Sequence, residues 1–334
     1  MKEASYYKKL KNKIVQCQLC PRFCTIKEDS KGNCGVRINK NGNLYSLVYE
    51  KPCTVHVDKI EKKPLYHFLP VTNIFSIATA GCNLHCLYCQ NWEISQCKPE
   101  EISHLDLTSE EIVKKAIEEK CKSISYTYTE PTIAIEYFLD IAKLARKNKL
   151  KNIIVSNGFI NKEPLKDFCK YLDAANIDLK SFDDKFYKEL TTASLKSILN
   201  TLKILKENNV WLEITNLIIP KKNDNIEEIK KMCTWIKDNL GENTPLHFSR
   251  FFPMYKMLNI KPTPKETLLK AKEIALKTGL KYIYIGNINI ENSENTYCSK
   301  CKKLLIERMG FTISQNNIKN GKCTCGKKIS GIWS

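Results

Sequence analysis

The chain has 334 residues, of which 43% are hydrophobic and 27% are charged, and it carries 16 cysteines and a formal net charge of +18. This length suits one large barrel-like domain with appended segments better than one small domain. No run of about 18 apolar residues is present, which excludes a membrane-spanning helix, and the basic first residues lack the apolar segment of a signal peptide. We therefore expect a cytoplasmic protein.

The positive charge is only a weak indication of an anionic partner such as RNA. The lysines lie on expected helix faces and are mixed with acidic residues, as in "KKAIEEKCK" (114–122) and "KEIALKTGLK" (272–281). Such mixing is typical of solvated helix surfaces, and net charge alone does not identify a partner. Nucleic-acid binding therefore remains an alternative that the sequence does not favour.

Residues 1–70 are expected to form a cysteine-rich N-terminal segment. A stretch within it, "NGNLYSLVYEKPCTVHVD" (41–58), alternates as in a hairpin. Four cysteines of this segment have metal-ligand spacing, Cys-x2-Cys-x3-Cys-x9-Cys, and are Cys17, Cys20, Cys24 and Cys34. Four thiolates can close a zinc site or hold a second iron–sulfur cluster, and spacing alone does not separate the two. A structural role is the simpler interpretation.

Residues 71–290 alternate short apolar strands with amphipathic helices. The expected strands are 73–80, 123–129, 152–156, 176–180, 210–219, 246–251 and 281–286. This alternation predicts an α/β fold with a parallel sheet and helices outside it. No Gly-rich dinucleotide fingerprint is present, so a TIM-like barrel, whole or partial, is favoured, with its chemistry at the C-terminal ends of the strands.

Three cysteines follow the first expected strand of this barrel, in "GCNLHCLYCQN" (81–91): Cys82, Cys86 and Cys89. Three thiolates leave a tetrahedral zinc site one ligand short, unless His85 supplies the fourth. They can instead hold three irons of a 4Fe–4S cluster and leave the fourth iron open. The spacing and the preceding strand favour the cluster.

Residues 291–334 are expected to form a C-terminal segment like a zinc ribbon. Its cysteines are Cys298, Cys301, Cys323 and Cys325. Four thiolates in two pairs are typical of structural zinc. The second pair is one residue shorter than the usual Cys-x2-Cys spacing.

The Cys-x3-Cys-x2-Cys motif resembles that of the radical S-adenosylmethionine (SAM) superfamily. With "CQLCPRFC", "IEKKPLYHFLP", "SNGF", "NIDLKSF" and "SGIW", the chain resembles the radical SAM proteins of the AmmeMemoRadiSam system, relatives of pyruvate formate-lyase activating enzymes. The resemblance implies a 4Fe–4S cluster on the three central cysteines and SAM on its open iron. It further implies SAM contacts from one tyrosine and from residues after the second, third and fourth strands: Tyr88, Glu130, Ser156, Asn157, Asp178 and Lys180.

The resemblance also implies a reaction. The cluster would cleave SAM reductively to a 5′-deoxyadenosyl radical, which abstracts hydrogen from a substrate. An activase-like protein or peptide target is favoured, with RNA or a small molecule as alternatives. A non-catalytic metal scaffold with Memo-like and Amme-type partners is the alternative from another class. Flavodoxin or ferredoxin is the expected electron donor.

Three residues on the last two expected strands could face the substrate or only pack inside the barrel: His247, Arg250 and Tyr284.

Overall fold

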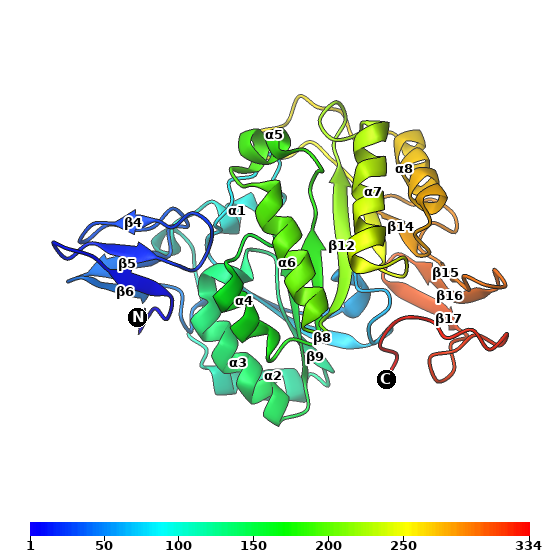
Figure 1. Ribbon diagram of the computed structural model, residues 1–334. Coiled ribbons are helices and arrows are strands. Elements are labelled where there is room, and N and C mark those ends of the chain that lie inside the picture. Colours follow the sequence, from blue (N-terminus) through cyan, green and yellow to red (C-terminus); the bar gives the residue numbers. More distant parts are fainter.

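The computed structural model describes residues 1–334 and is built around one eight-stranded sheet (Figure 1). The strands are β1 (Lys2–Glu3), β2 (Tyr7–Lys9), β3 (Val15–Cys17), β4 (Thr25–Ile26), β5 (Arg37–Lys40), β6 (Asn43–Ser46), β7 (Pro52–Lys59), β8 (Asn73–Thr79), β9 (Ser123–Tyr126), β10 (Lys151–Ser156), β11 (Ala174–Asp178), β12 (Trp211–Ile218), β13 (Leu246–Arg250), β14 (Ile283–Gly286), β15 (Thr296–Tyr297), β16 (Leu304–Met309) and β17 (Thr312–Asn316). The α-helices are α1 (Trp92–Ser95), α2 (Ser109–Glu118), α3 (Ile135–Lys147), α4 (Lys162–Cys169), α5 (Asp184–Phe186), α6 (Leu195–Glu207), α7 (Ile226–Leu240) and α8 (Lys265–Thr278).

The large sheet runs in chain order from β7 to β14, with β8 to β14 parallel to their neighbours and β7 antiparallel to β8. Right-handed crossovers between strands in simple chain order place every connecting helix on the same face of a sheet. The sheet does not close, because β7 and β14 each have only one partner strand. The expected α/β fold with a partial barrel is therefore confirmed.

Local sequence signals explain where the helices form. The helix α2 begins after Thr108, whose hydroxyl accepts a hydrogen bond from the Glu111 N–H while the Glu111 carboxylate accepts one from the Thr108 N–H. This capping box satisfies two backbone donors that a helix start leaves free. The apolar side of α2, with Ile112 and Val113, is buried. The helix is thus fixed at its start and along one face.

One expectation about the strands was wrong. The residues of the expected hairpin at 41–58 do not pair with one another, because β6 pairs with β5 and β1, whereas β7 pairs with β8. The first parallel strand of an open barrel has a free edge, and β7 covers it over seven pairs of residues from Pro52 to Lys59. Alternation in the sequence predicts strands but does not identify their partners.

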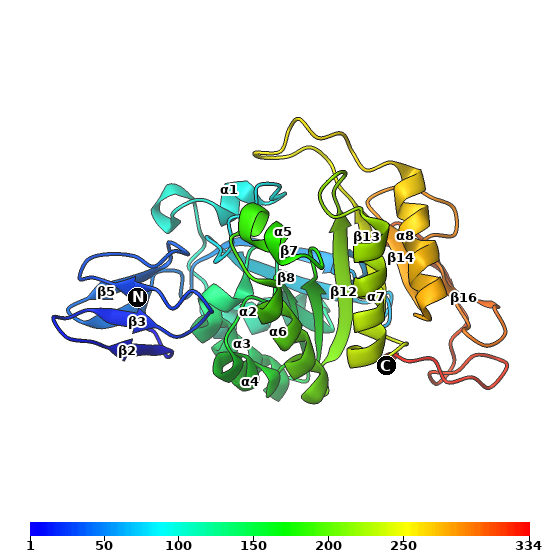
Figure 2. The ribbon, with the colours of Figure 1, turned by 45° about the horizontal axis from the view of Figure 1, so that its top comes forward.

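Two small β structures flank the sheet on opposite sides (Figures 1 and 2). At one end, β1 to β6 form two three-stranded sheets, here called the N-terminal lobe (residues 1–46). Tyr6 and Tyr49 tie this end of the chain to the barrel helices by donating hydrogen bonds to Asp167 and Asp140. At the other end, β15 to β17 form a three-stranded sheet, here called the C-terminal ribbon (residues 296–334).

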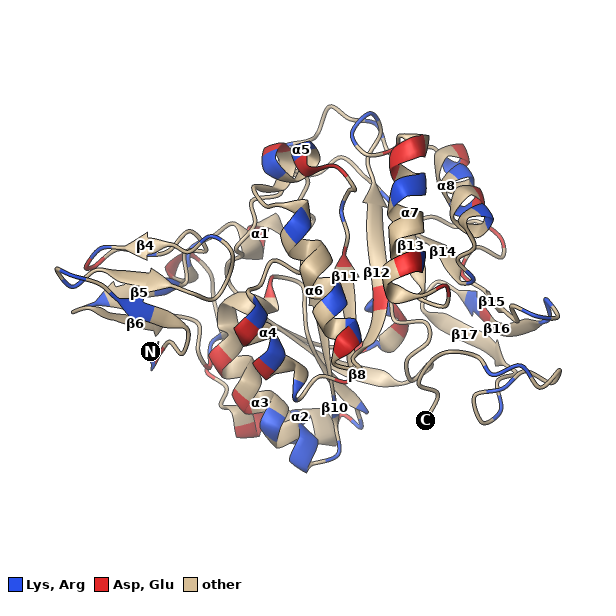
Figure 3. Cartoon of the chain, viewed as in Figure 1, with Lys and Arg blue, Asp and Glu red and all other residues tan.

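Charged side chains are distributed over the helices with both signs interspersed (Figure 3). Many lysines pair with acids one turn away, as Lys277 and Lys270 do with Glu273. Such exposed pairs contribute little stability and reduce the local positive field. None of the helices combines the length and the apolar character needed to cross a bilayer.

Candidate active site

A cavity of about 310 Å³ lies at the C-terminal ends of the barrel strands. This volume is in the range of small-molecule and cofactor pockets. All nine residues that the sequence suggests for the cluster and for SAM line it: Cys82, Cys86, Cys89, Tyr88, Glu130, Ser156, Asn157, Asp178 and Lys180. They come from the last residues of β10 and β11 and from the loops after β8, β9, β10 and β11. Residues far apart in the chain are brought together because parallel strands end at the same edge of a sheet.

The three central cysteines lie in the loop between β8 and the short helix α1, and none is in a disulfide. The Leu84 N–H points to the Cys82 sulfur at 3.4 Å, and the Cys89 sulfur lies 3.2 Å from the Ser95 hydroxyl. Burial raises the pKa of Cys86 to about 11, so without a metal its thiol keeps its proton. Metal binding would displace that proton.

Glu130 holds two strand ends together. Its carboxylate accepts hydrogen bonds from the Thr132 N–H and hydroxyl at 3.0 and 2.6 Å, from the Ser156 hydroxyl at 2.8 Å and from the Asn157 N–H at 2.8 Å. Burial raises the pKa of Glu130, and these four donors oppose the rise. Because both oxygens are already bonded, the side chain positions the loops after β9 and β10 rather than offering a free carboxylate.

Asn157 connects this network to the cysteines. Its side-chain amide donates to Asn83 Oδ1 at 3.0 Å and lies 3.7 Å from the Cys82 sulfur. An N–H group facing a cysteine sulfur is one means by which a protein adjusts a bound iron–sulfur cluster. The loops after β8 and β10 are therefore joined at the cavity wall.

Lys180 and Asp178 form an ion pair of 2.9 Å at the end of β11. Burial opposes the charge on Lys180, but Asp178 and the Tyr88 and Cys86 side chains raise its pKa well above the usual value, so the amine is protonated. Its Nζ lies 5.8 Å from the centre of the Tyr88 ring. The Tyr88 hydroxyl is buried and has no hydrogen-bond partner. The cavity thus offers a cation, an anion and one unpartnered hydroxyl to a ligand.

Tyr128 lies in the loop after β9, directly before Thr129 and Glu130. Its φ of 65° lies in the left-handed region that glycine tolerates best. The hydroxyl of Tyr128 donates to Asp58, and its ring lies 4.2 Å from the Lys63 Nζ. The contacts of the hydroxyl and the ring therefore hold Tyr128 in a backbone conformation that costs a non-glycine residue free energy.

Sequence reasoning missed Lys62 and Lys63, which also line the cavity. Both bind Asp58, with Nζ–O distances of 2.8 and 2.7 Å. Burial lowers the pKa of Lys63 to about 8. The signal available was the pair of lysines in "IEKK", but the sequence alone does not reveal the pairing of β7 with β8 that places this segment beside the barrel.

A second cavity of about 610 Å³ adjoins the first and shares four lining residues with it, Lys62, Gln90, Thr215 and Ser249. His247 lines this second cavity, and its Nε2 lies 2.7 Å from the Glu213 carboxylate. Tyr284 is buried beside it, with its hydroxyl bonded to His67 and Thr296. Arg250 lines neither cavity and donates to the Thr263 carbonyl. Of the three residues that the sequence suggested could face the substrate, only His247 therefore lines one of these two cavities.

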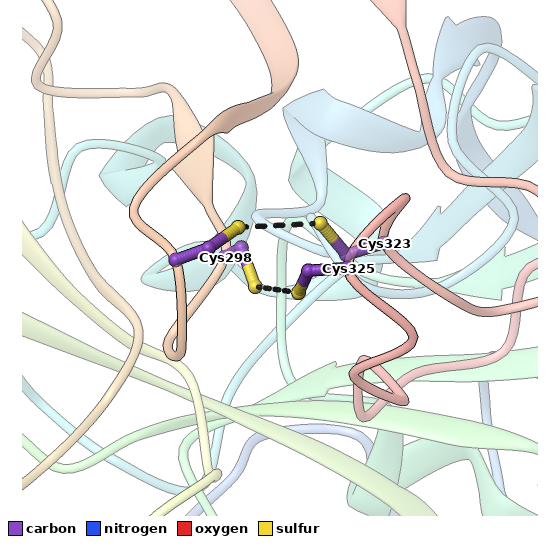
Figure 4. A group of neighbouring side chains, drawn as sticks. Cys298, Cys323 and Cys325 are labelled. Carbon is purple, nitrogen blue, oxygen red and sulfur yellow. Dashed lines mark hydrogen bonds between the residues drawn. The ribbon is translucent and has the colours of Figure 1, made fainter.

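The four C-terminal cysteines converge, with all sulfur atoms within 4.8 Å of one another. Cys298 and Cys325 sulfurs are 3.7 Å apart, and those of Cys301 and Cys323 are 3.6 Å apart (Figure 4). A tetrahedron of thiolates with zinc–sulfur bonds of about 2.3 Å has edges of about 3.8 Å. The short spacing between Cys323 and Cys325 does not prevent this arrangement.

The four N-terminal cysteines lie on a different cavity, a small one of about 20 Å³ that all four line. They do not form a group as tight as the C-terminal four. The structure thus brings together the cysteines of each group: the C-terminal four in one compact set, and the central three and the N-terminal four each around a cavity.

Comparison with known proteins identifies the family. The profile of the radical SAM superfamily matches residues 76–236. The "Uncharacterized protein MJ0808" of Methanocaldococcus jannaschii is 48% identical over 98% of this chain and 99% of its own length. The "Putative glycyl-radical enzyme activating enzyme MJ1632" of the same organism is 26% identical over 72% of this chain and 89% of its own length. The chain belongs to the radical SAM superfamily.

Membership makes the protein an enzyme of this superfamily, with homology to glycyl-radical activating enzymes. The fold agrees, since the crystal structure of a radical SAM methyltransferase from Sphaerobacter thermophilus superposes with a TM-score of 0.52 at 12% identity, covering 66% of this chain and 67% of that one. The superfamily uses a 4Fe–4S cluster and SAM. The donors in the first cavity fit both, because three free thiols meet a cation, an anion and an unpartnered hydroxyl there.

Proposed function

We propose that Cys82, Cys86 and Cys89 bind the three protein-ligated irons of a 4Fe–4S cluster and that the fourth iron is left for SAM. When bound, this cluster supplies the electron that cleaves SAM to methionine and a 5′-deoxyadenosyl radical, which abstracts hydrogen from the substrate. The observation that carries the proposal is the cavity itself, in which exactly three cysteines lie beside the polar ends of the next three strands.

Different residues of the cavity bind different parts of SAM. Lys180, fixed by Asp178, offers a protonated amine to the carboxylate of SAM, because a charged hydrogen bond of this kind contributes about 1.5–3 kcal/mol. Tyr88 contributes an aromatic surface to the adenine. Glu130, Ser156 and Asn157 hold the loops after β9 and β10 in place, so their backbone groups face the ligand.

We further propose an activase-like reaction on a protein or peptide. Two observations support a large substrate: the homology to a putative glycyl-radical enzyme activating enzyme, and the cavity of about 610 Å³ that shares lining residues with the first cavity. RNA or a small molecule remains the alternative substrate. A metal scaffold within a Memo-like and Amme-type assembly is the less favoured reading, since a scaffold needs no ion pair at a SAM site.

The remaining assignments are proposals as well. Flavodoxin or ferredoxin serves as the electron donor, and the protein works in the cytoplasm. Residues 1–70, 71–290 and 291–334 act as N-terminal, barrel and C-terminal units. The C-terminal cysteines bind zinc, which their sulfur–sulfur distances of 3.6 and 3.7 Å support.

The proposal is tested with anaerobically reconstituted protein, SAM and a strong one-electron reductant. We expect 5′-deoxyadenosine and methionine in equal amounts. Cys86→Ser should stop their formation and lose the cluster, whereas Cys97→Ser, which changes an isolated cysteine outside the cavity, should leave both unchanged. A spectroscopically verified cluster that yields no 5′-deoxyadenosine would favour the scaffold.

A further inference from the structure

The four cysteines of the N-terminal lobe surround a small, mostly apolar cavity. Its volume is about 20 Å³, and its walls also include Leu19, Ile26 and Ile133. A space of this size holds at least one water molecule. Four thiols that line one small cavity without a disulfide are typical of a metal site.

The spacing of these cysteines does not match a single zinc ion. Four sulfur atoms that bind one zinc ion each lie about 2.3 Å from the metal, so the space between them is too small for a water molecule. The C-terminal four have that compact arrangement, with all sulfurs within 4.8 Å, and the N-terminal four do not. The central three are also outside that limit. Thiolates that each bind a different iron of a cluster lie farther apart than thiolates that share one ion.

A buried cation faces this cavity. Arg37 is 1% exposed and lines the cavity, and one of its guanidinium nitrogens binds Glu136 at 2.5 Å. Its Nε and Nη1 have no hydrogen-bond partner. Buried donors without partners are rare in proteins and call for an acceptor. Sulfur atoms of a negatively charged cluster would satisfy them.

The cavity is also next to the catalytic site. Asn83 lines the N-terminal cavity, whereas its neighbours Cys82 and Leu84 line the first cavity, so one segment separates the two. At Gly81 a Cβ atom would lie 2.6 Å from Val36 Cγ1 and 2.9 Å from the Cys34 carbonyl oxygen. Only glycine allows this close approach, and φ there is 94°.

We propose that Cys17, Cys20, Cys24 and Cys34 bind a second 4Fe–4S cluster, in which every iron has a protein ligand and Arg37 donates hydrogen bonds to the cluster. This inference goes beyond the proposed function, because the cluster's presence does not depend on SAM cleavage. It also resolves the choice between zinc and iron that the sequence leaves open.

The test is the metal content of protein reconstituted anaerobically with iron and sulfide. Wild-type protein should hold about eight irons per chain. The triple variant Cys82→Ser, Cys86→Ser, Cys89→Ser should retain about four irons and show an electron paramagnetic resonance signal on reduction. Cys17→Ser/Cys20→Ser should hold about four, and the matched pair Cys53→Ser/Cys97→Ser about eight.

The triple variant decides the matter even if Cys17→Ser/Cys20→Ser fails to fold. Triple-variant protein with no iron and two zincs per chain would overturn the proposal. A wild-type signal broadened by interaction between the two reduced clusters, and absent from either single-cluster variant, would support the placement of the second cluster beside Cys82. Failure of the proposed function is separate, since it would appear as eight irons without SAM cleavage.

Discussion

The central and C-terminal cysteine groups show how the same side chain builds two kinds of site. The C-terminal four lie within 4.8 Å of one another at one end of the molecule, and no other residue type completes their set. The central three line a cavity of about 310 Å³ together with charged and hydroxyl groups. A closed set of thiolates binds an ion for structure, and an incomplete set in a polar cavity leaves a place for a ligand.

The strongest way to test this difference is to remove one ligand from each group. Cys89→Ser should abolish the central cluster and all SAM cleavage, because a cluster with two protein ligands is not retained. Cys323→Ser should leave the central iron content unchanged. The iron and zinc contents of both variants are measured and compared. An equal loss of iron in both would mean that the two cysteine groups are not independent.

Zinc removal should affect stability next most strongly. The ribbon packs Leu305, Ile306 and Ile329 against Tyr66 and Tyr284 of the barrel, and Cys298 and Cys323 lie in the same buried cluster. A chelator that takes the zinc should lower the midpoint of thermal unfolding by roughly 5 °C or more, since a structural zinc contributes several kcal/mol. Calorimetry with and without the chelator measures the shift. An unchanged midpoint would contradict a structural zinc.

A smaller effect is expected from the cation of the central cavity. Lys180→Met removes the amine that pairs with Asp178 and leaves the cysteines in place. SAM affinity should fall about 10- to 100-fold, the equivalent of one charged hydrogen bond. The affinity is measured by equilibrium binding of SAM to protein that contains the iron–sulfur cluster. Lys185→Met, which changes an exposed lysine on α5, is the control. Loss of iron in Lys180→Met would show a different role for this lysine.

The isolated cysteines should matter least. Cys233 is fully buried on α7 and belongs to the hydrophobic core. Cys233→Ala should cost only about 1 kcal/mol, because a small apolar side chain is replaced by a slightly smaller one. Denaturant unfolding measures this cost, and metal analysis should find iron and zinc at wild-type levels. A change in either metal would place Cys233 in a site that the structure does not suggest.

The sequence predicted a parallel sheet and the strand that precedes the central cysteines, because buried parallel strands are short apolar runs that alternate with helices. It placed β11 two residues too late, since "NIDLK" (176–180) includes Leu179 and Lys180, which follow the strand, and omits Ala174 and Ala175. The nine residues that it suggested for the cluster and for SAM line one cavity, whereas of the three possible substrate residues only His247 lines a cavity.

Long-range partners were not predictable from the sequence. Lys62 and Lys63 reach the cavity only because β7 pairs with β8, and alternation alone suggested a hairpin instead. Cysteine spacing likewise could not separate zinc from iron–sulfur, because the distinction depends on how the sulfur atoms are arranged in space. The compact C-terminal group and the wider N-terminal group differ in exactly that respect.

The most direct test is a crystal structure with SAM, with anomalous scattering recorded above the iron and zinc absorption edges. We predict iron at Cys82, Cys86 and Cys89, with the amino and carboxylate groups of SAM on the iron that has no cysteine, and zinc at the four C-terminal cysteines. Zinc at the central cysteines, or a fourth protein ligand such as His85 in place of SAM, would contradict the account.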